Sequence, residues 1–202
     1  MSALALLLAL ASPADEAIAA ERAFAAAAQT EGQWTAFRAF AAERAFLFTP
    51  YPNYAREVLA DAENPLVSVM WWPARSFVSC DGAMAVNIGP WVRPGPRHGY
   101  FITVWERQAD GEWRWLLDDG ADLEVPMAAG EAPIVRQADC ESIPTGRRLA
   151  ETIHDGPRPH GASPDRTLSW SWTPSGPGVL TIRFFNGDEM ETVFTHETAP
   201  AR

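Results

Sequence analysis

Residues 81–122 read DGAMAVNIGPWVRPGPRHGYFITVWERQADGEWRWLLDDGAD, and this stretch decides the fold. Three runs within it, 84–91, 100–107 and 112–119, are rich in β-branched and aromatic residues, and Gly, Pro or Asp bounds each run. The prolines between the first two runs lack the N–H group that a strand ladder requires, and Ala109-Asp110-Gly111 suits a tight turn. The stretch therefore predicts three consecutive antiparallel strands.

Three strings in this region carry a family resemblance. CDGAMAVNIGPW, HGYFITVWERQADGEW and WLLDDG resemble strand motifs of the nuclear transport factor 2-like superfamily, specifically the SnoaL-like domains of bacterial exported proteins. With the segment before them, the resemblance covers residues 15–122. It implies an α+β fold in which N-terminal helices pack in the hollow of a curved antiparallel sheet, a cystatin-like cone. The superfamily includes ketosteroid isomerases, polyketide cyclases, dehydratases and non-catalytic binding modules, so membership alone leaves the activity open.

The chain before the strands is typical of helices. Asp15 can cap a helix that Gly32 ends, a second short helix is expected over 34–42, and Asn53 can cap a third. With these helices and the strands of the meander, the family resemblance implies a cone domain over residues 15–125.

The chain after residue 125 has a different composition. Residues 126–165 are rich in Pro, Gly, Ala and Asp without hydrophobic periodicity, which indicates an irregular connection. Residues 166–197 contain three more strand-like runs, and Asn186-Gly187 is a strong hairpin signal. We expect an appended C-terminal antiparallel meander that packs on the cone, because three strands alone are marginally stable.

The first 14 residues, MSALALLLALASPA, carry no charge and contain an apolar run over 3–10. Ala9-Leu10-Ala11 and Ser12-Pro13-Ala14 both place small residues where signal peptidase requires them. The basic start typical of such signals is missing and the segment is short, so an Ala-rich start of a helix is the alternative. We expect a signal peptide over 1–14 and a periplasmic or secreted protein.

Cys80 and Cys140 are the two cysteines of the chain. In an exported protein they can pair, and closing a loop of about 60 residues stabilises a fold by roughly 4 kcal/mol on the chain-entropy model. In a reducing compartment they would be two free thiols. No CxxC motif or Cys/His spacing typical of zinc is present, so no metal is expected.

Charge and motifs exclude several classes of function. The formal net charge is −10 with a pI near 4.8, and the 16 basic residues form no cluster, so nucleic acid is not an expected partner. The apolar run near the start is too short for a membrane span. The GxGxxG, GxSxG, HExxH and P-loop patterns are absent, so no cofactor is expected.

Strand pairing predicts which side chains share a face. We assume that the turn at 109–111 pairs Glu106 with Arg114 and that the proline loop pairs Arg93 with His98. One face then carries Asn87, Trp91, Tyr100, Ile102, Val104, Leu116 and Asp118. The other carries Val86, Ile88, Phe101, Thr103, Trp105, Trp113, Trp115, Leu117 and Asp119. A slip of one residue at either loop would exchange the two sets.

The first face has the composition of a small-molecule pocket, with apolar walls and a few polar groups. The expected ligand contacts are Asn87, Trp91, Tyr100, Ile102, Val104 and Leu116. Burial would raise the pKa of Asp118 and suit it to abstract a proton beside a carbonyl, with Tyr100 or Asn87 donating to the enolate oxygen. His98, at the mouth, is a candidate acid or base. The alternatives are that Asp118 accepts backbone N–H groups at a strand end and that His98 is an exposed loop residue.

Two classes of function follow from these residues. The first is an exported SnoaL-like protein that binds a small apolar molecule in the cone. The second is a cofactor-independent isomerase, cyclase or dehydratase that uses Asp118 as general base. Because both faces of the meander carry large residues, each face needs cover, which either the C-terminal strands or a second subunit of a homodimer would provide.

Overall fold

The computed structural model describes residues 11–49, 51–95, 97–143, 153–154, 159–174 and 178–198. The described part of the chain contains three helices, α1 (Pro13–Thr30), α2 (Gln33–Phe40) and α3 (Ala55–Val58). The strands are β1 (Ala41–Phe48), β2 (Pro52–Tyr54), β3 (Met70–Trp71), β4 (Arg75–Val78), β5 (Met84–Arg93), β6 (Arg97–Arg107), β7 (Trp113–Asp122), β8 (Ile134–Gln137), β9 (Ile153–His154), β10 (His160–Ala162), β11 (Leu168–Thr173), β12 (Val179–Phe185) and β13 (Met190–Glu197).

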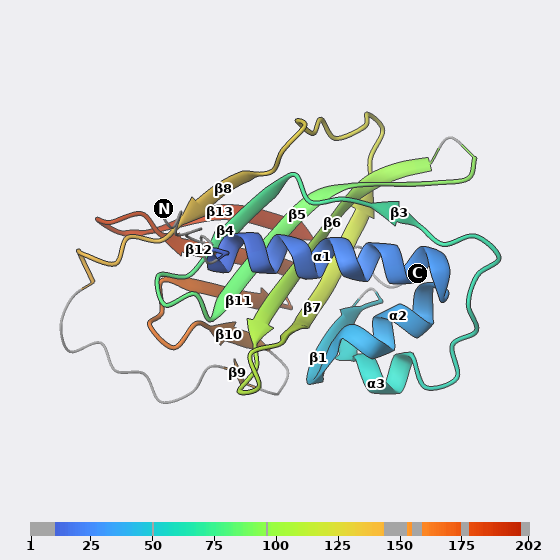
Figure 1. Cartoon of the computed structure of the whole chain (residues 1–202), viewed down its shortest axis with the longest axis horizontal. Helices are drawn as coiled ribbons and strands as arrows, with labels where there is room; N and C mark the ends of the chain where they lie inside the picture. Colours follow the sequence, from blue (N-terminus) through green and yellow to red (C-terminus); the bar gives the residue numbers. More distant parts are fainter. Residues whose placement is uncertain are drawn as a thin grey trace, which may run out of the picture.

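These strands form two sheets (Figure 1). The first has eight strands in the order β2-β1-β7-β6-β5-β4-β8, with β3 paired to β5 beside this path. It is a mixed sheet, because β1 runs parallel to β7 and β8 runs parallel to β4. The second sheet has five antiparallel strands in the order β13-β12-β11-β10-β9. The meander predicted over 81–122 is confirmed as β5, β6 and β7, in the interior of the first sheet.

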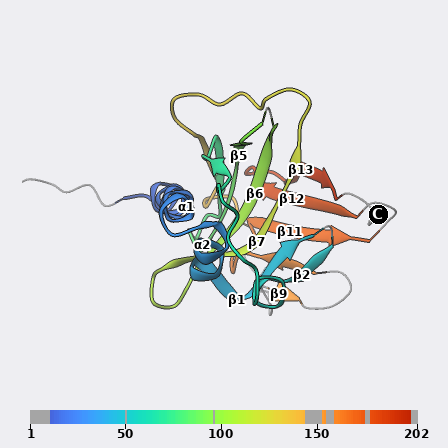
Figure 2. The same cartoon turned by 90° about the vertical axis from the view of Figure 1, so that its right-hand side faces the viewer.

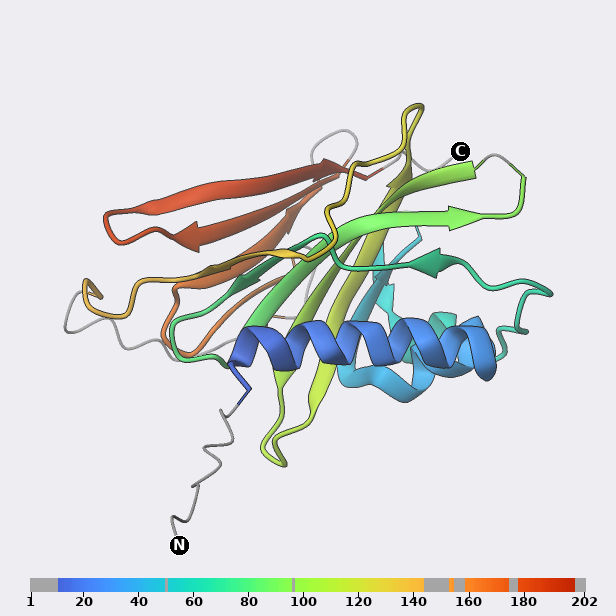
Figure 3. The same ribbon diagram turned by 45° about the horizontal axis from the view of Figure 1, so that its top comes forward.

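The elements are arranged in three layers. Figures 2 and 3 show α1 lying across one face of the first sheet, while the second sheet covers the opposite face. One core cluster fills the space between the helices and the first sheet, and it includes Phe24, Phe37, Trp71, Trp105 and Trp115. A second cluster fills the space between the two sheets, and it includes Phe77, Val86, Leu168, Trp170 and Ile182. The first sheet is therefore apolar on both faces.

The expected α+β cone is wrong. Strands are the main secondary structure of the described residues, and the centre is a mixed sheet stacked on a second sheet rather than a curved antiparallel sheet that encloses helices. The physical reason is the pair of apolar faces on β5 to β7, because a sheet of this kind needs a layer on each side. Residues 126–165 also contribute β8 to the first sheet and β9 and β10 to the second, so the predicted C-terminal meander is part of a five-stranded sheet.

The beginning of α1 differs from the expected one by three residues. Ser12 rather than Asp15 is the N-cap, since its hydroxyl accepts a hydrogen bond from the backbone N–H of Asp15 at 3.2 Å, and the Asp15 carboxylate accepts from the Ser12 N–H at 3.1 Å. Pro13 occupies the first turn, where its missing N–H costs nothing. Residues 1–10, which make up most of the expected signal peptide, lie outside the described part of the chain.

A disulfide joins Cys80 and Cys140, the pairing expected from the sequence, with the two Cα atoms 5.2 Å apart. Cys80 follows β4 and Cys140 follows β8, so the bond fastens the parallel edge strand. Beside it, the backbone N–H of Asp81 donates to Asp165 and the N–H of Asp165 donates to Asp81, at 2.6 and 3.1 Å. This loop therefore ties the first sheet to the turn before β11.

The chain covers its own second face. The cluster between the sheets buries Trp170, Leu180 and Ile182 of the C-terminal sheet against the first sheet. The C-terminal sheet therefore covers the face of the meander that a second subunit would otherwise have to cover. Across the described ranges, no helix has both the length and the apolar character to cross a membrane.

Candidate functional site

The strand register differs from the expected one at two places. The loop after β5 pairs Arg93 with Arg97 rather than with His98, so Asn87 lies opposite Thr103. Glu106 lies opposite Arg114 as predicted, but the register then shifts between Val104 and Trp105. The two consecutive residues 116 and 117 both pack in the cluster between the sheets, and Asp118 lies opposite Thr103. Because side chains alternate along a strand, each shift exchanges the two faces.

The predicted face is therefore divided between two environments. Trp91 belongs to the helix-side cluster, and Asn87 and Asp118 contact groups on that side as well. Tyr100, Ile102, Val104 and Leu116 pack instead in the cluster between the two sheets. Three of the seven residues expected to share one surface, Asn87, Trp91 and Asp118, therefore lie on the helix side. Thr103 lies on β6 between Asn87 of β5 and Asp118 of β7.

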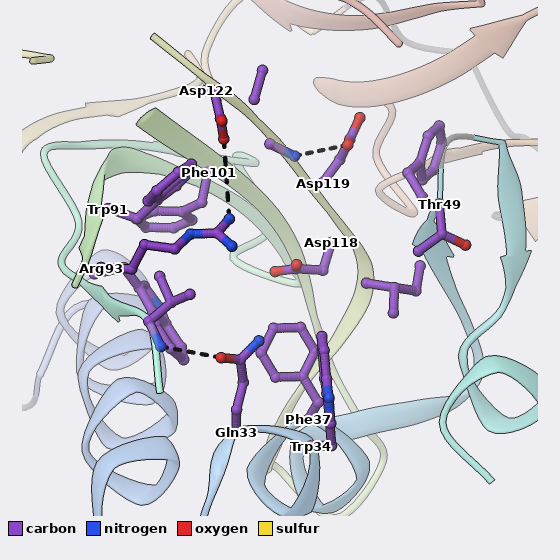
Figure 4. A pocket seen from close by; sticks show the side chains of 16 residues that line it. Gln33, Trp34, Phe37, Thr49, Trp91, Arg93, Phe101, Asp118, Asp119 and Asp122 are labelled. Carbon is purple, nitrogen blue, oxygen red and sulfur yellow. Dashed lines mark hydrogen bonds and ion pairs between the residues drawn. The ribbon is translucent and has the colours of Figure 1, made fainter. Parts of the chain in front are cut away.

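A pocket with a volume of about 230 Å³ opens on the helix side, where α2, β3 and the ends of β1, β5 and β7 meet (Figure 4). Its walls are mainly aromatic and aliphatic, with a few polar groups. The lining residues are Gln33, Trp34, Phe37, Leu47, Phe48, Thr49, Val69, Trp71, Trp91, Arg93, Phe101, Asp118, Asp119, Gly120, Ala121 and Asp122.

Asp118 forms the polar floor of this pocket. Figure 4 shows its carboxyl group pointing into the space between Arg93 above and Phe37 below. The Thr103 hydroxyl donates to its Oδ2 at 2.9 Å, and the side chain is partly exposed in the pocket. Burial, followed by the nearby Glu21 carboxyl, raises the pKa of Asp118 well above its usual value. Asp118 thus keeps its proton to a higher pH than an ordinary aspartate does.

Glu21 lies beneath Asp118 and was not among the predicted residues. It is completely buried, and its two carboxyl oxygens accept hydrogen bonds from Trp71 Nε1 at 2.8 Å and Trp105 Nε1 at 2.7 Å. Asn87 Nδ2 donates to the same carboxyl at 3.3 Å. Burial raises the pKa of Glu21 to about 7, against the lowering effect of these hydrogen bonds.

The sequence does contain a signal for Glu21. Among the buried residues of α1, Ala17, Phe24 and Ala28 stand three, four or seven positions from it, so Glu21 falls on the buried stripe of the helix. A single acidic residue at such a position has to find donors in the core. The indole N–H groups of the two tryptophans are those donors.

The remaining predicted residues lie outside the pocket. The Asn87 side chain donates to the Ala17 carbonyl oxygen and to Glu21, below the pocket floor. The Tyr100 hydroxyl contacts His196 Nδ1 on the opposite face of the sheet, and His196 Nε2 lies 3.1 Å from Asp119 Oδ2. Burial raises the pKa of Tyr100 to about 12, with a further contribution from Asp119.

His98 stands near the start of β6 and does not line the pocket. Its Nε2 is buried and has no hydrogen-bond partner within the described ranges. The geometry therefore brings neither His98 nor Tyr100 to Asp118. Among the described residues, no group of three or more His, Cys, Asp or Glu side chains is arranged to hold a metal ion.

Comparison with known proteins gives little guidance. No family model and no curated protein matches the chain. A crystal structure of a "putative aromatic ring hydroxylase" from Novosphingobium aromaticivorans is similar over 55% of this chain and 90% of its own, with 16% identity and a TM-score of 0.38. The resemblance to the nuclear transport factor 2-like superfamily is therefore not confirmed, and the function has to be inferred from the site itself.

The buried Glu21 carboxyl predicts an unusual dependence of stability on pH. Its pKa is about 7 in the folded protein and near 4.5 in the unfolded chain, so the folded state binds the proton more tightly. The free energy of unfolding should therefore fall by about 3 kcal/mol as the pH rises from about 4.5 to about 7. Urea unfolding of the wild type and of Glu21→Gln across this range measures the effect. A fall of equal size in both proteins would contradict the assignment to Glu21.

Proposed function

We propose that the pocket above Asp118 binds a small, mainly apolar molecule that carries one polar group. The observation that carries this proposal is the combination of a preformed cavity, aromatic walls from Trp34, Phe37, Trp91 and Phe101, and a single acidic floor. Sites for small molecules typically combine apolar walls with a small number of polar groups that fix orientation.

The volume limits the size of the ligand. Pockets for drug-sized molecules typically measure about 300–1,000 Å³. A cavity of about 230 Å³ is smaller and suits one ring with a short substituent. The ligand would place its ring against the aromatic walls and direct its polar atom towards Asp118.

An enzyme of the isomerase, cyclase or dehydratase type, with Asp118 as general base, is the second proposal. The raised pKa and partial exposure of Asp118 in the pocket favour it. Tyr100 and Asn87, the expected donors to an enolate, hydrogen-bond elsewhere, which weighs against it. Replacing Asp118 with Asn should lower turnover by about 100-fold or more if this proposal holds, and a variant with unchanged turnover would end it.

Filling the pocket tests the binding proposal. Val69 lines the cavity, whereas Val67 lies two positions away and is 57% exposed outside it. We expect Val69→Trp to weaken binding of benzyl alcohol at least about tenfold, because losing about 60 Å² of apolar contact costs about 1.5 kcal/mol. The matched control Val67→Trp should stay within about twofold in a ligand-observed NMR titration. Equal affinities in the two variants, with both folded, would place the ligand elsewhere.

We also propose that the protein works in the periplasm or outside the cell, as an exported SnoaL-like protein. The Cys80–Cys140 disulfide supports an oxidising compartment, and the apolar start of the sequence supports export. Thiol titration of protein recovered from cell fractions tests this proposal. Two free thiols in the recovered protein would contradict it.

A further inference from the structure

Charge is distributed unevenly between the floor and the mouth of the pocket. At the mouth, Arg93 Nη2 lies 4.0 Å from Asp122 Oδ1, and Arg97 Nη2 lies 2.5 Å from Asp122 Oδ2. These three side chains are 38–57% exposed, so solvent screens them. At the floor, Asp118 and Glu21 lie together with the neutral Thr103, and no cationic side chain in the described structure forms an ion pair with either carboxyl. An acidic pair without a cation therefore lies where electrostatic interactions are strongest.

The walls of the pocket also favour positive charge. Aromatic rings have negative faces, which attract cations within about 6 Å of the ring centroid. Trp91 already uses one face in this way, since the Arg93 guanidinium lies 4.6 Å from its ring centroid. Trp34, Phe37 and Phe101 complete the aromatic wall around Asp118 (Figure 4).

We infer that the ligand of this pocket is a small organic cation, a primary amine on a ring or short chain whose ammonium group pairs with Asp118 while its apolar part lies against the aromatic walls. This inference rests on the proposed binding function and adds the chemical class of the ligand. The formal net charge of −10 attracts such cations at long range as well.

Binding of a cation should release a proton. The titratable or charged groups around Asp118 in the described structure are Glu21 from α1, Arg93 from β5, and Asp119 and Asp122 of its own strand. Without a ligand, burial and the neighbouring Glu21 favour a protonated floor. An ammonium group stabilises the carboxylate, so the proton leaves as the cation enters. The affinity for an amine should therefore rise with pH, as long as the amine stays protonated.

Three probes of similar size test the inference: benzylammonium, benzyl alcohol and benzoate. We expect wild-type protein to bind benzylammonium about tenfold or more tightly than the alcohol at pH 8, and benzoate most weakly. The preference should shrink as the pH falls to 5. Calorimetry in two buffers of different ionisation enthalpy should show proton release for the amine and none for the alcohol.

Two variants locate the cation. Asp118→Asn should weaken benzylammonium binding about 10- to 100-fold, the range for losing a charge-assisted hydrogen bond, and change benzyl alcohol binding by less than about threefold. Asp188→Asn, which removes an exposed carboxylate from the turn after β12 and outside the pocket, should change benzylammonium binding by less than about threefold.

The outcomes separate this inference from the function on which it rests. If none of the three probes binds, the proposed binding function fails. If benzyl alcohol binds as tightly as benzylammonium, or benzoate binds best, the pocket is a binding site but the ligand is not a cation. The comparison of probes on wild-type protein decides the inference even if Asp118→Asn does not fold.

Discussion

Replacing Glu21 with Leu is expected to lower the free energy of unfolding by about 3–5 kcal/mol. The substitution introduces an apolar side chain of similar size, but it removes the acceptor of Trp71, Trp105 and Asn87. A buried donor left without a partner costs about 1–3 kcal/mol, and the two indole N–H groups would remain without one, while Asn87 would keep its bond to the Ala17 carbonyl oxygen. Urea unfolding followed by fluorescence measures the loss.

Two control variants test whether the loss of stability comes from the missing acceptor. Arg22→Leu changes the next residue of the same helix, which is exposed, and should alter the free energy of unfolding by less than about 0.5 kcal/mol. Glu21→Gln retains one acceptor oxygen and should cost less than Glu21→Leu. If Glu21→Leu were as stable as the wild type, the carboxyl would not be needed to satisfy the indole groups.

Removing the disulfide with Cys80→Ser and Cys140→Ser together is expected to cost about 4 kcal/mol. The bond closes a loop of 60 residues, and the chain-entropy model assigns about that free energy to a loop of this length. The loss should be greatest at β8, because this exposed edge strand is held by its parallel pairing with β4 and by the bond just beyond it. Urea unfolding gives the total, and amide hydrogen exchange gives the distribution.

The expected exchange pattern is specific. In the double variant, amides of β8 should exchange with a lower free energy of opening than that of global unfolding. Amides of β6, in the interior of the sheet, should still exchange only through global unfolding. Reduced wild-type protein should behave as the double variant does, which separates the loss of the bond from the effect of the serines. Uniform loss across both strands would show that the bond acts on the whole fold rather than on its edge.

The local strands could be predicted from the sequence, but their faces could not. The runs over 81–122 have clear turn residues and strand-forming composition, which fixed β5, β6 and β7. Their alternation does not separate an apolar face from a polar one, because Trp105 packs under the helices while Val104 packs against the second sheet. Without that contrast, the sequence does not reveal the register shift near Leu116, nor that the loop after β5 is one residue shorter than expected. Each of these two differences exchanges the faces of the strand.

The arrangement of the layers depends on long-range pairing, which single-sequence patterns do not reveal. The need for cover on both faces of the meander was evident from its large residues, but the pairing of β8 with β4 was not. Of the site, Asp118 was predicted as an acidic group in a pocket, and its partners were not. Thr103 was expected on the opposite face, and Glu21 was not among the predicted residues.

The parallel pairing of β1 with β7 has a consequence for how the chain folds. β1 ends at Phe48 and β7 begins at Trp113, so the two strands can pair only after the chain between them, which includes β5 and β6, has been made. Contacts this distant in sequence slow folding, because the entropy of closing the loop is lost before the contact forms. While the ribosome is still synthesising β6, β2 is the strand available to pair with β1, and the apolar side of α2 has no β7 to cover it. A newly made chain would therefore remain open to aggregation until β7 emerges.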